Sequence, residues 1–138
     1  MIILEPLENA IVSLEESIES FKGLNPSSGE QLKQYKFVRD SVIRRFEYTY
    51  ELSWKFLKRF LKEEAEIEEI MIKNLFRQAA RLGLIEEAEN WFEYHKQRNL
   101  TSHTYVEEIA EQTIKIASAF LVDAKSLLRE LKENLNGN

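Results

Sequence analysis

The sequence contains no cysteine and only two histidines, His95 and His103. Disulfide bridges and thiolate metal sites are therefore excluded, and a zinc site built from several imidazoles is not expected. The chain also lacks an apolar run near the roughly 20 residues that a membrane-spanning helix needs, and its first residues lack the basic start and long apolar core of a signal peptide. We therefore expect a cytoplasmic protein that needs no membrane, metal or cofactor.

Proline and glycine are scarce as well, with two prolines and four glycines among 138 residues. Few positions can therefore break a helix or form a tight hairpin turn, and the abundant Leu, Glu, Lys and Arg favour helices. A chain of this length with 43% hydrophobic residues can bury one core but is too short for two ordinary domains. The composition predicts an all-α protein in which residues 1–138 form a single helical domain.

Apolar residues recur at intervals of three and four along five stretches, which predicts about five helices. The expected ranges are 4–21, 29–62, 71–82, 86–99 and 105–135, so that two of the helices are long. Gly83, followed by the apolar Leu84, predicts a Schellman-type end for the third helix.

The long helix predicted over residues 29–62 carries apolar residues on two sides. One seam contains Ile43, Phe46, Tyr50, Trp54, Leu57 and Leu61, and the other contains Val42, Thr49, Leu52, Phe56 and Phe60. Because a surface helix needs only one buried stripe, the second seam predicts contact with a partner, most simply another copy of the chain. The alternative is that the bundle itself covers both sides.

Charge is distributed unevenly along a chain whose net charge is −5. Residues 36–62 include eight basic and three acidic residues, whereas residues 63–93 include nine acidic and three basic residues. A basic helix on an acidic protein can steer a polyanion to one face. Solvated helix faces linked by ion pairs would give the same pattern.

Polar side chains gather in residues 98–105, which hold a guanidinium, an amide, three hydroxyls, an imidazole and a phenol. On a continuous helix Arg98 and His103 would be separated by about 140° and would point away from each other. Thr101 and Ser102 have short hydroxyl side chains that favour caps and turns. We therefore expect the helix to break at these two residues, so that Arg98 and His103 can converge.

Metal-free RNA cleavage is the chemistry that this cluster fits best. An imidazole at His103 can transfer a proton near neutral pH, and the guanidinium of Arg98 matches phosphate oxygens. Acyl transfer by Ser102 would need a nucleophile elbow, and metal-assisted hydrolysis would need converging carboxylates; neither motif is present. A structural alternative stays open, in which Arg98 and Asn99 cap a helix and His103 fills a loop. His95 falls on an apolar helix face and is expected to be partly buried and structural.

Three blocks of sequence, taken together and in order, resemble a known family. They are residues 39–55 (RDSVIRRFEYTYELSWK), 77–85 (RQAARLGLI) and 98–105 (RNLTSHTY). Over most of its length the chain resembles the HEPN proteins called nucleotidyltransferase substrate-binding proteins. The resemblance implies an up-and-down helical bundle that forms a homodimer and that binds a cognate minimal nucleotidyltransferase.

The family's motif, Arg-x4-His-x-Tyr, is filled here by Arg98, His103 and Tyr105, and Asn99 matches a polar residue often found beside the arginine. The resemblance implies that Arg98, Asn99 and His103 form the catalytic site of a metal-independent ribonuclease toxin that cleaves RNA. It also implies that the nucleotidyltransferase, as antitoxin, silences the toxin by AMPylation of Tyr105. The alternative is a non-catalytic subunit that presents a substrate to the nucleotidyltransferase.

Overall fold

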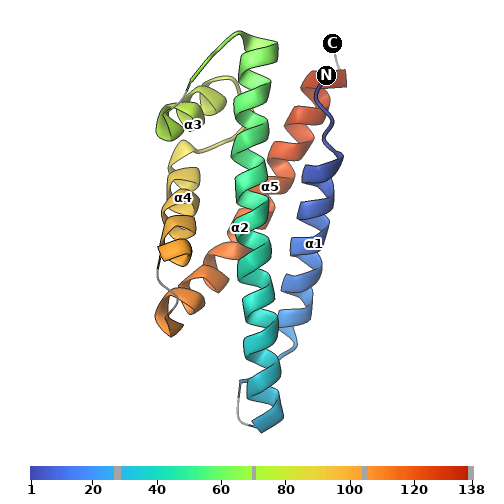
Figure 1. The fold of residues 1–138 in the computed structure, drawn as a ribbon. Helices are drawn as coiled ribbons and strands as arrows, with labels where there is room; N and C mark the ends of the chain where they lie inside the picture. Colours follow the sequence, from blue (N-terminus) through green and yellow to red (C-terminus); the bar gives the residue numbers. More distant parts are fainter. Residues whose placement is uncertain (27–28, 70, 104–105, 137–138) are drawn as a thin grey trace.

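The computed structural model describes residues 1–26, 29–69, 71–103 and 106–136 (Figure 1). Within these residues the chain forms five helices and no strand: α1 (Glu5–Lys22), α2 (Gly29–Ala65), α3 (Ile72–Arg81), α4 (Ala88–His103) and α5 (Glu107–Asn136). α1, α2, α4 and α5 alternate in direction, and the short α3 and α4 lie to one side of α2 (Figure 1). The prediction of an all-α bundle with two long helices is confirmed.

An aromatic cluster at the centre of the bundle joins α2, α4 and α5. Phe120 of α5 is fully buried. Its ring packs edge-to-face against Phe46, Trp91 and Tyr94, with ring centroids 5.1, 5.7 and 5.1 Å away. Phe76 of α3 contacts Trp91 at 5.4 Å. Such aromatic pairs contribute about 0.5–1.5 kcal/mol each beyond the area they bury. α4 is therefore anchored to the core one to two turns before the segment that carries the predicted motif.

The turn between α3 and α4 follows the predicted Schellman geometry. Gly83 has a φ of 79°, the Leu84 amide donates to the Ala79 carbonyl at 2.9 Å, and the Gly83 amide donates to the Ala80 carbonyl at 3.1 Å. Leu84 is 1% exposed, which supplies the apolar contact that accompanies this motif. The turn lets α4, which begins at Ala88, pack against α3.

Most of the second apolar seam of α2 packs within the bundle, with Leu52 and Phe56 partly buried, so the seam does not by itself require a partner, and the homodimer stays a prediction. Val42, Thr49 and Phe60 are 1%, 0% and 6% exposed, and the Thr49 hydroxyl donates to the Ala10 carbonyl of α1 at 3.2 Å. α2 contacts α1, α3, α4 and α5. A helix enclosed on several sides needs more than one buried stripe, so this seam carries no information about a second copy.

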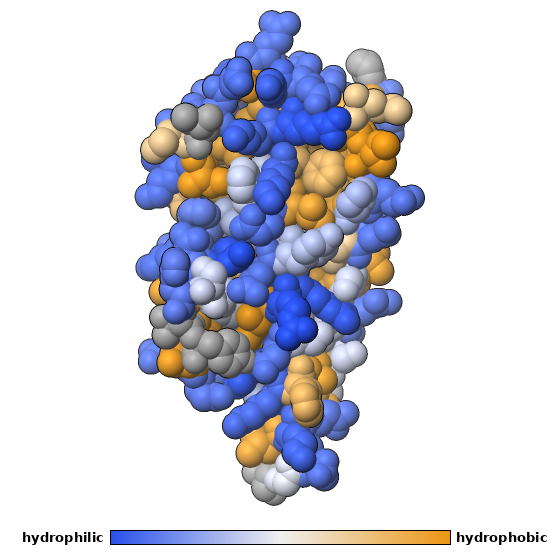
Figure 2. Space-filling model, in the orientation of Figure 1, coloured by the Kyte–Doolittle hydropathy of each residue, from blue (hydrophilic) through white to orange (hydrophobic). Residues whose placement is uncertain are grey.

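The face seen in Figure 2 is mainly hydrophilic, with hydrophobic side chains in separate patches. Phe37 and Tyr48 of α2 and Val122 of α5 are 71%, 59% and 66% exposed. Scattered apolar residues of this kind are ordinary on folded proteins. In the part of the chain that the structure describes, no helix is both long and apolar enough to cross a membrane.

Candidate functional site

α4 continues through the predicted break and ends at His103. The Thr101 hydroxyl donates to the Arg98 carbonyl at 2.9 Å, and the Ser102 hydroxyl donates to the Asn99 carbonyl at 3.0 Å. Both side chains therefore bond the backbone of the preceding turn, an arrangement that a helix tolerates. The prediction of a break at Thr101 and Ser102 is wrong, because the helix continues through both residues to His103.

The continuous helix separates the predicted catalytic residues. Arg98 and His103 are five positions apart on α4, or about 140° around its axis, so one protomer does not bring them onto the same face. Asn99 and His103 are four positions apart and do share a face. α5 begins at Glu107, and Tyr105, the predicted modification site, lies outside the described residues.

Arg98 points toward α2. Its Nη1 lies 3.8 Å from a carboxylate oxygen of Glu47, and its Nε lies 3.5 Å from one of Glu51. These distances exceed those of good hydrogen bonds, and within the described chain the buried Nε has no hydrogen-bond partner. The shortest contact of Glu47 is instead with the Thr101 hydroxyl, which donates to it at 2.6 Å. Arg98 is therefore a 23% exposed cation that retains donors for another group.

A hollow of about 410 Å³ opens on the other side of α4 and contains both histidines. Asn99 and His103 line it, together with His95. Its remaining lining residues are Lys73 of α3 and Phe92, Glu93, Lys96 and Leu100 of α4. His95, Asn99 and His103 follow one another at intervals of four, which places their side chains along one stripe of the helix. His103 is exposed, whereas His95 is partly buried as predicted.

His95 is held between a buried tyrosine and the predicted orienting amide. The Tyr50 hydroxyl lies 2.8 Å from His95 Nδ1, and Asn99 Nδ2 lies 3.3 Å from His95 Nε2. Burial lowers the pKa of His95, and burial likewise raises the pKa of Tyr50 well above its usual value. Near neutral pH the pair therefore consists of a protonated phenol and a neutral imidazole. This contact links Asn99 to the core of the bundle.

The start of α5 is tied to α2 by a buried arginine. Arg39 is 2% exposed; its Nη1 and Nη2 donate to the two oxygens of Glu107 at 2.6 and 3.1 Å, and Nη1 also donates to Glu111 at 3.1 Å. The hydrogen bond from Arg39 lowers the pKa of Glu107. The first turn of α5 is thus fixed shortly after the site residues of α4 end.

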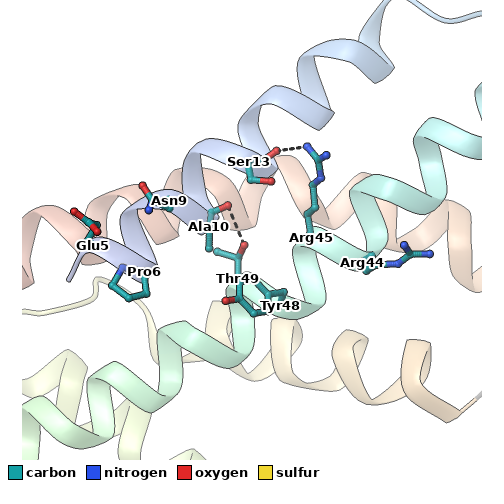
Figure 3. A pocket seen from close by; sticks show the side chains of 9 residues that line it. All are labelled: Glu5, Pro6, Asn9, Ala10, Ser13, Arg44, Arg45, Tyr48 and Thr49. Atoms are coloured by element: carbon teal, nitrogen blue, oxygen red, sulfur yellow. Dashed lines mark hydrogen bonds between the residues drawn. The ribbon is translucent and has the colours of Figure 1, made fainter. Parts of the chain in front are cut away.

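A larger hollow, of about 560 Å³, lies between α1 and α2 (Figure 3). Arg44, Arg45 and Tyr48 contribute to its lining, and Arg45 Nη1 donates to the Ser13 carbonyl at 2.8 Å. Its described lining includes no histidine and none of the predicted catalytic residues. It is larger than the hollow beside α4, but the imidazoles that could transfer protons line the latter.

Sequence reasoning missed His95 and Lys73 as residues of the candidate site. His95 could have been found from its spacing, because His95, Asn99 and His103 fall on one stripe once α4 is taken as continuous. Lys73 reaches the hollow from α3. No feature of the sequence indicated that this residue would lie beside His103. With a helix break predicted at Thr101, His103 was not placed on the same helix as His95 and Asn99, so the shared stripe was not recognised.

Comparison with known proteins places the chain in a family. Residues 3–133 match the family described as nucleotidyltransferase substrate binding protein like. The probable ribonuclease HepT of Haemophilus influenzae is 33% identical, over 94% of this chain and 92% of its own length.

Two solved structures share the fold. One, from Haemophilus influenzae, is described as the fold of a substrate binding domain of a nucleotidyltransferase; it has a TM-score of 0.80 and 30% identity, over 94% of this chain and 99% of that one. The other is the tri-AMPylated Shewanella oneidensis HEPN toxin in complex with MNT antitoxin, with a TM-score of 0.67 and 19% identity over 94% and 98% of the two chains. The chain therefore belongs to the family described as nucleotidyltransferase substrate binding protein like.

Proposed function

We propose that this protein is the ribonuclease toxin of a toxin–antitoxin pair and that it cleaves RNA without a metal ion. The observation that carries the proposal is its 33% identity, over nearly its whole length, to the Haemophilus ribonuclease. The hollow beside α4 supports it, because an exposed imidazole and an amide line a space that is open to solvent.

The reaction needs a proton acceptor, a proton donor and a cation. The ribose 2′-hydroxyl attacks phosphorus and loses its proton to a base, while the departing 5′ oxygen receives a proton from an acid, so that a cyclic phosphate and a 5′-hydroxyl result. His103 serves one of these two proton transfers. Arg98 stabilises the charge on the phosphate, and the Asn99 amide orients it by hydrogen bonding.

A homodimer resolves the separation of Arg98 and His103. Within one protomer the two side chains diverge by about 140°, so one phosphate cannot contact both directly. A second copy placed against the end of α4 would supply the missing group, since closed twofold dimers are the commonest oligomers. The contacts of Arg98 with Glu47 and Glu51, at 3.8 and 3.5 Å, are loose enough for a phosphate to compete with them.

Single substitutions test the catalytic assignment. We expect His103→Ala and Arg98→Ala to abolish RNA cleavage while the far-ultraviolet circular dichroism stays helical, because neither side chain belongs to the aromatic core. Lys115→Ala, on the exposed surface of α5, is the matched control and should cleave normally. Cleavage should also persist in EDTA if no metal takes part. Undiminished cleavage by both site variants would rule out this mechanism.

Mixing the two inactive variants tests the composite site. A heterodimer of the Arg98→Ala and His103→Ala chains contains one wild-type Arg98 and one wild-type His103 on different protomers. If the site combines the two copies, cleavage should reappear on mixing and peak near equal amounts of the two chains. No activity at any ratio, with heterodimers verified by native mass spectrometry, would show that each site lies within one protomer.

Regulation through Tyr105 is the second part of the proposal. AMPylation by a cognate minimal nucleotidyltransferase would add bulk and negative charge two residues from His103, where the RNA phosphate must bind. The Shewanella toxin of the same fold is AMPylated and bound to its antitoxin, which supports the idea. Incubation with the neighbouring nucleotidyltransferase and ATP should add AMP by intact mass, and Tyr105→Phe should remove at least one such addition. Full modification of the phenylalanine variant would contradict this assignment.

A non-catalytic binding subunit is the second candidate function. The description of the family, and that of the Haemophilus structure with a TM-score of 0.80, favour it. It predicts a stable complex with the nucleotidyltransferase and a higher transferase activity toward a third substrate, without RNA cleavage or AMP on this chain. The ribonuclease assay on the purified protein alone separates the two functions.

A further inference from the structure

The hollow beside His103 adjoins a second hollow along the groove between α3 and α4. The second, of about 420 Å³, shares Lys73 and His95 with the first and extends to Asn74 and Arg77 of α3. From His103 back to His95 the groove follows eight residues of α4, or about 12 Å of helix. That length exceeds the spacing of one nucleotide, which is about 3.4 Å along a stacked strand.

The groove is basic although the sequence around it is acidic. Lys73, Arg77 and Lys96 line the two hollows, and Glu93 is the single acidic residue among their described lining residues. Residues 63–93, which include α3 and the start of α4, hold nine acidic and three basic residues, and two of those three basic residues line the groove. In the described chain neither Lys73 nor Lys96 takes part in an ion pair, so both ammonium groups can meet a ligand.

An aromatic ring lies among these cations. Phe92 is partly buried, with Lys73 Nζ 5.5 Å and Arg77 Cζ 5.3 Å from its ring centroid. Arg77 Nη1 donates to the Asn74 side chain at 2.9 Å, which holds the guanidinium against the ring. Aromatic rings and arginine planes are the surfaces on which single-stranded bases stack, and nearby lysines bind the connecting phosphates.

We infer that the α3–α4 groove, formed by Lys73, Arg77, Phe92, His95 and Lys96, binds the RNA nucleotides next to the one cleaved at His103. The inference rests on the proposed ribonuclease function and extends it by naming the substrate as single-stranded RNA several nucleotides long. Lys73 and Lys96 contact phosphates, and Phe92 with Arg77 receives a base. The strand then runs along α4 from His103 toward α3.

The binding test uses His103→Ala protein, which should hold RNA without cutting it. Fluorescence anisotropy with a labelled single-stranded oligoribonucleotide, repeated over a series of salt concentrations, gives the affinity and its salt dependence. Adding Lys73→Gln and Lys96→Gln should lower the slope of log K against log salt by about 0.7 for each lost phosphate contact. Lys115→Gln removes the same charge outside the groove and should leave the slope unchanged. Equal slopes for the groove and control variants would overturn the inference.

A stacking variant gives an independent readout. Phe92→Leu keeps an apolar side chain, and it should weaken RNA binding by about 5- to 150-fold, as expected for the loss of one stacked base. Its salt slope should match that of the parent, because stacking releases no counterions. Urea unfolding of this variant verifies the fold. Unchanged affinity in a folded Phe92→Leu protein would contradict the stacking role.

A cleavage assay separates this inference from the function on which it rests. With His103 intact, the Lys73→Gln, Lys96→Gln double variant should lose most of the gain in kcat/KM that longer RNA gives the wild type over a dinucleotide, whereas Lys115→Gln should keep that gain. If the wild type cleaves RNA and the double variant matches Lys115→Gln on long substrates, the groove inference alone fails. If the wild type neither binds nor cleaves RNA, both fail.

Discussion

Replacing Tyr50 by phenylalanine should raise the pKa of His95 and weaken the fold by a small, measurable amount. Tyr50 is fully buried, and in the described part of the chain His95 Nδ1, at 2.8 Å, is the one hydrogen-bond partner of its hydroxyl. A buried donor left without an acceptor costs about 1–3 kcal/mol. We therefore assign the hydroxyl as donor and Nδ1 as acceptor.

This assignment sets the remaining protons of the network. Neutral His95 must then carry its proton on Nε2, which lies 3.3 Å from the Asn99 amide. Two N–H groups cannot share a hydrogen bond, so Asn99 presents its oxygen to Nε2 through half a turn of its amide. The Asn99 amino group then faces away from the ring, where it can donate to a phosphate.

The magnitude follows from the environment of the pair. Tyr50→Phe keeps the ring and its packing, so the loss is that of one hydrogen bond, about 0.5–1.5 kcal/mol of unfolding free energy. For a chain of this length that corresponds to a fall in Tm of about 2–6 °C. Because the lost donor had stabilised the neutral imidazole, the pKa of His95 should rise.

The pH dependence has a defined sign. Burial holds the folded-state pKa of His95 below its ordinary value of 6.5, so below about pH 6.5 the unfolded chain binds the proton more readily than the folded one. The contribution of His95 to the unfolding free energy is therefore complete above pH 6.5 and declines as the pH falls below it. His95→Gln should lack this decline.

The assay is a proton NMR titration of the imidazole signals, with His103→Ala used for assignment, together with urea unfolding at pH 7.5 and 5.5. The opposite tautomer, in which Nδ1–H donates to the Tyr50 oxygen, stabilises the protonated ring equally well or better. It therefore predicts that the pKa of His95 stays constant or falls in Tyr50→Phe. Either result would refute the proton arrangement and with it the orientation of Asn99.

Three further changes test the fold around the site. Phe120→Ala removes the central ring of the aromatic cluster and should lower the unfolding free energy by about 3–5 kcal/mol in urea titrations. Gly83→Ala should lower the unfolding free energy by about 1–2 kcal/mol in the same assay. The φ of 79° is unfavourable for alanine, and no neighbouring atom lies within 4 Å of the added methyl group, so the strain is confined to the backbone. The hydrogen bond from Arg39 lowers the pKa of Glu107, so the contribution of this carboxylate to stability is lost as the pH falls through that lowered value. Glu107→Gln should therefore flatten the loss of stability below pH 4.5. An unchanged acid profile would argue against the contact between Arg39 and Glu107.

Helix positions were predictable because apolar periodicity is a local property. The predicted range 4–21 compares with Glu5–Lys22 in the structure, and the second helix begins at Gly29 as expected. Gly83 also behaved as predicted, because a Schellman turn depends on a left-handed residue and an apolar neighbour that are both visible in the sequence. The prediction of all-α architecture needed no information about tertiary contacts.

The predicted break failed because the outcome depended on a tertiary contact. Thr101 can end a helix or bond the preceding turn, and local propensity favours the first. In the structure its hydroxyl also meets Glu47 of α2 at 2.6 Å, 54 residues away, and this contact favours the helical alternative. The second seam of α2 was open to two interpretations for a related reason: periodicity indicates which sides of a helix are covered but does not identify what covers them.

The charges around His103 indicate that the α3–α4 groove and a second copy of the chain would each supply positive charge to bound RNA. The carbonyl end of α4 has a partial negative charge of about half a unit, and Glu47 and Glu51 lie beside Arg98. An RNA phosphate at His103 would therefore meet repulsion from its own protomer unless other cations outweigh it. Lys73 and Lys96 supply that charge on the groove side of α4, and an Arg98 from a second copy would supply it at the reacting phosphate. Two separate sources of cations explain how a protein with a net charge of −5 could bind RNA at this one place.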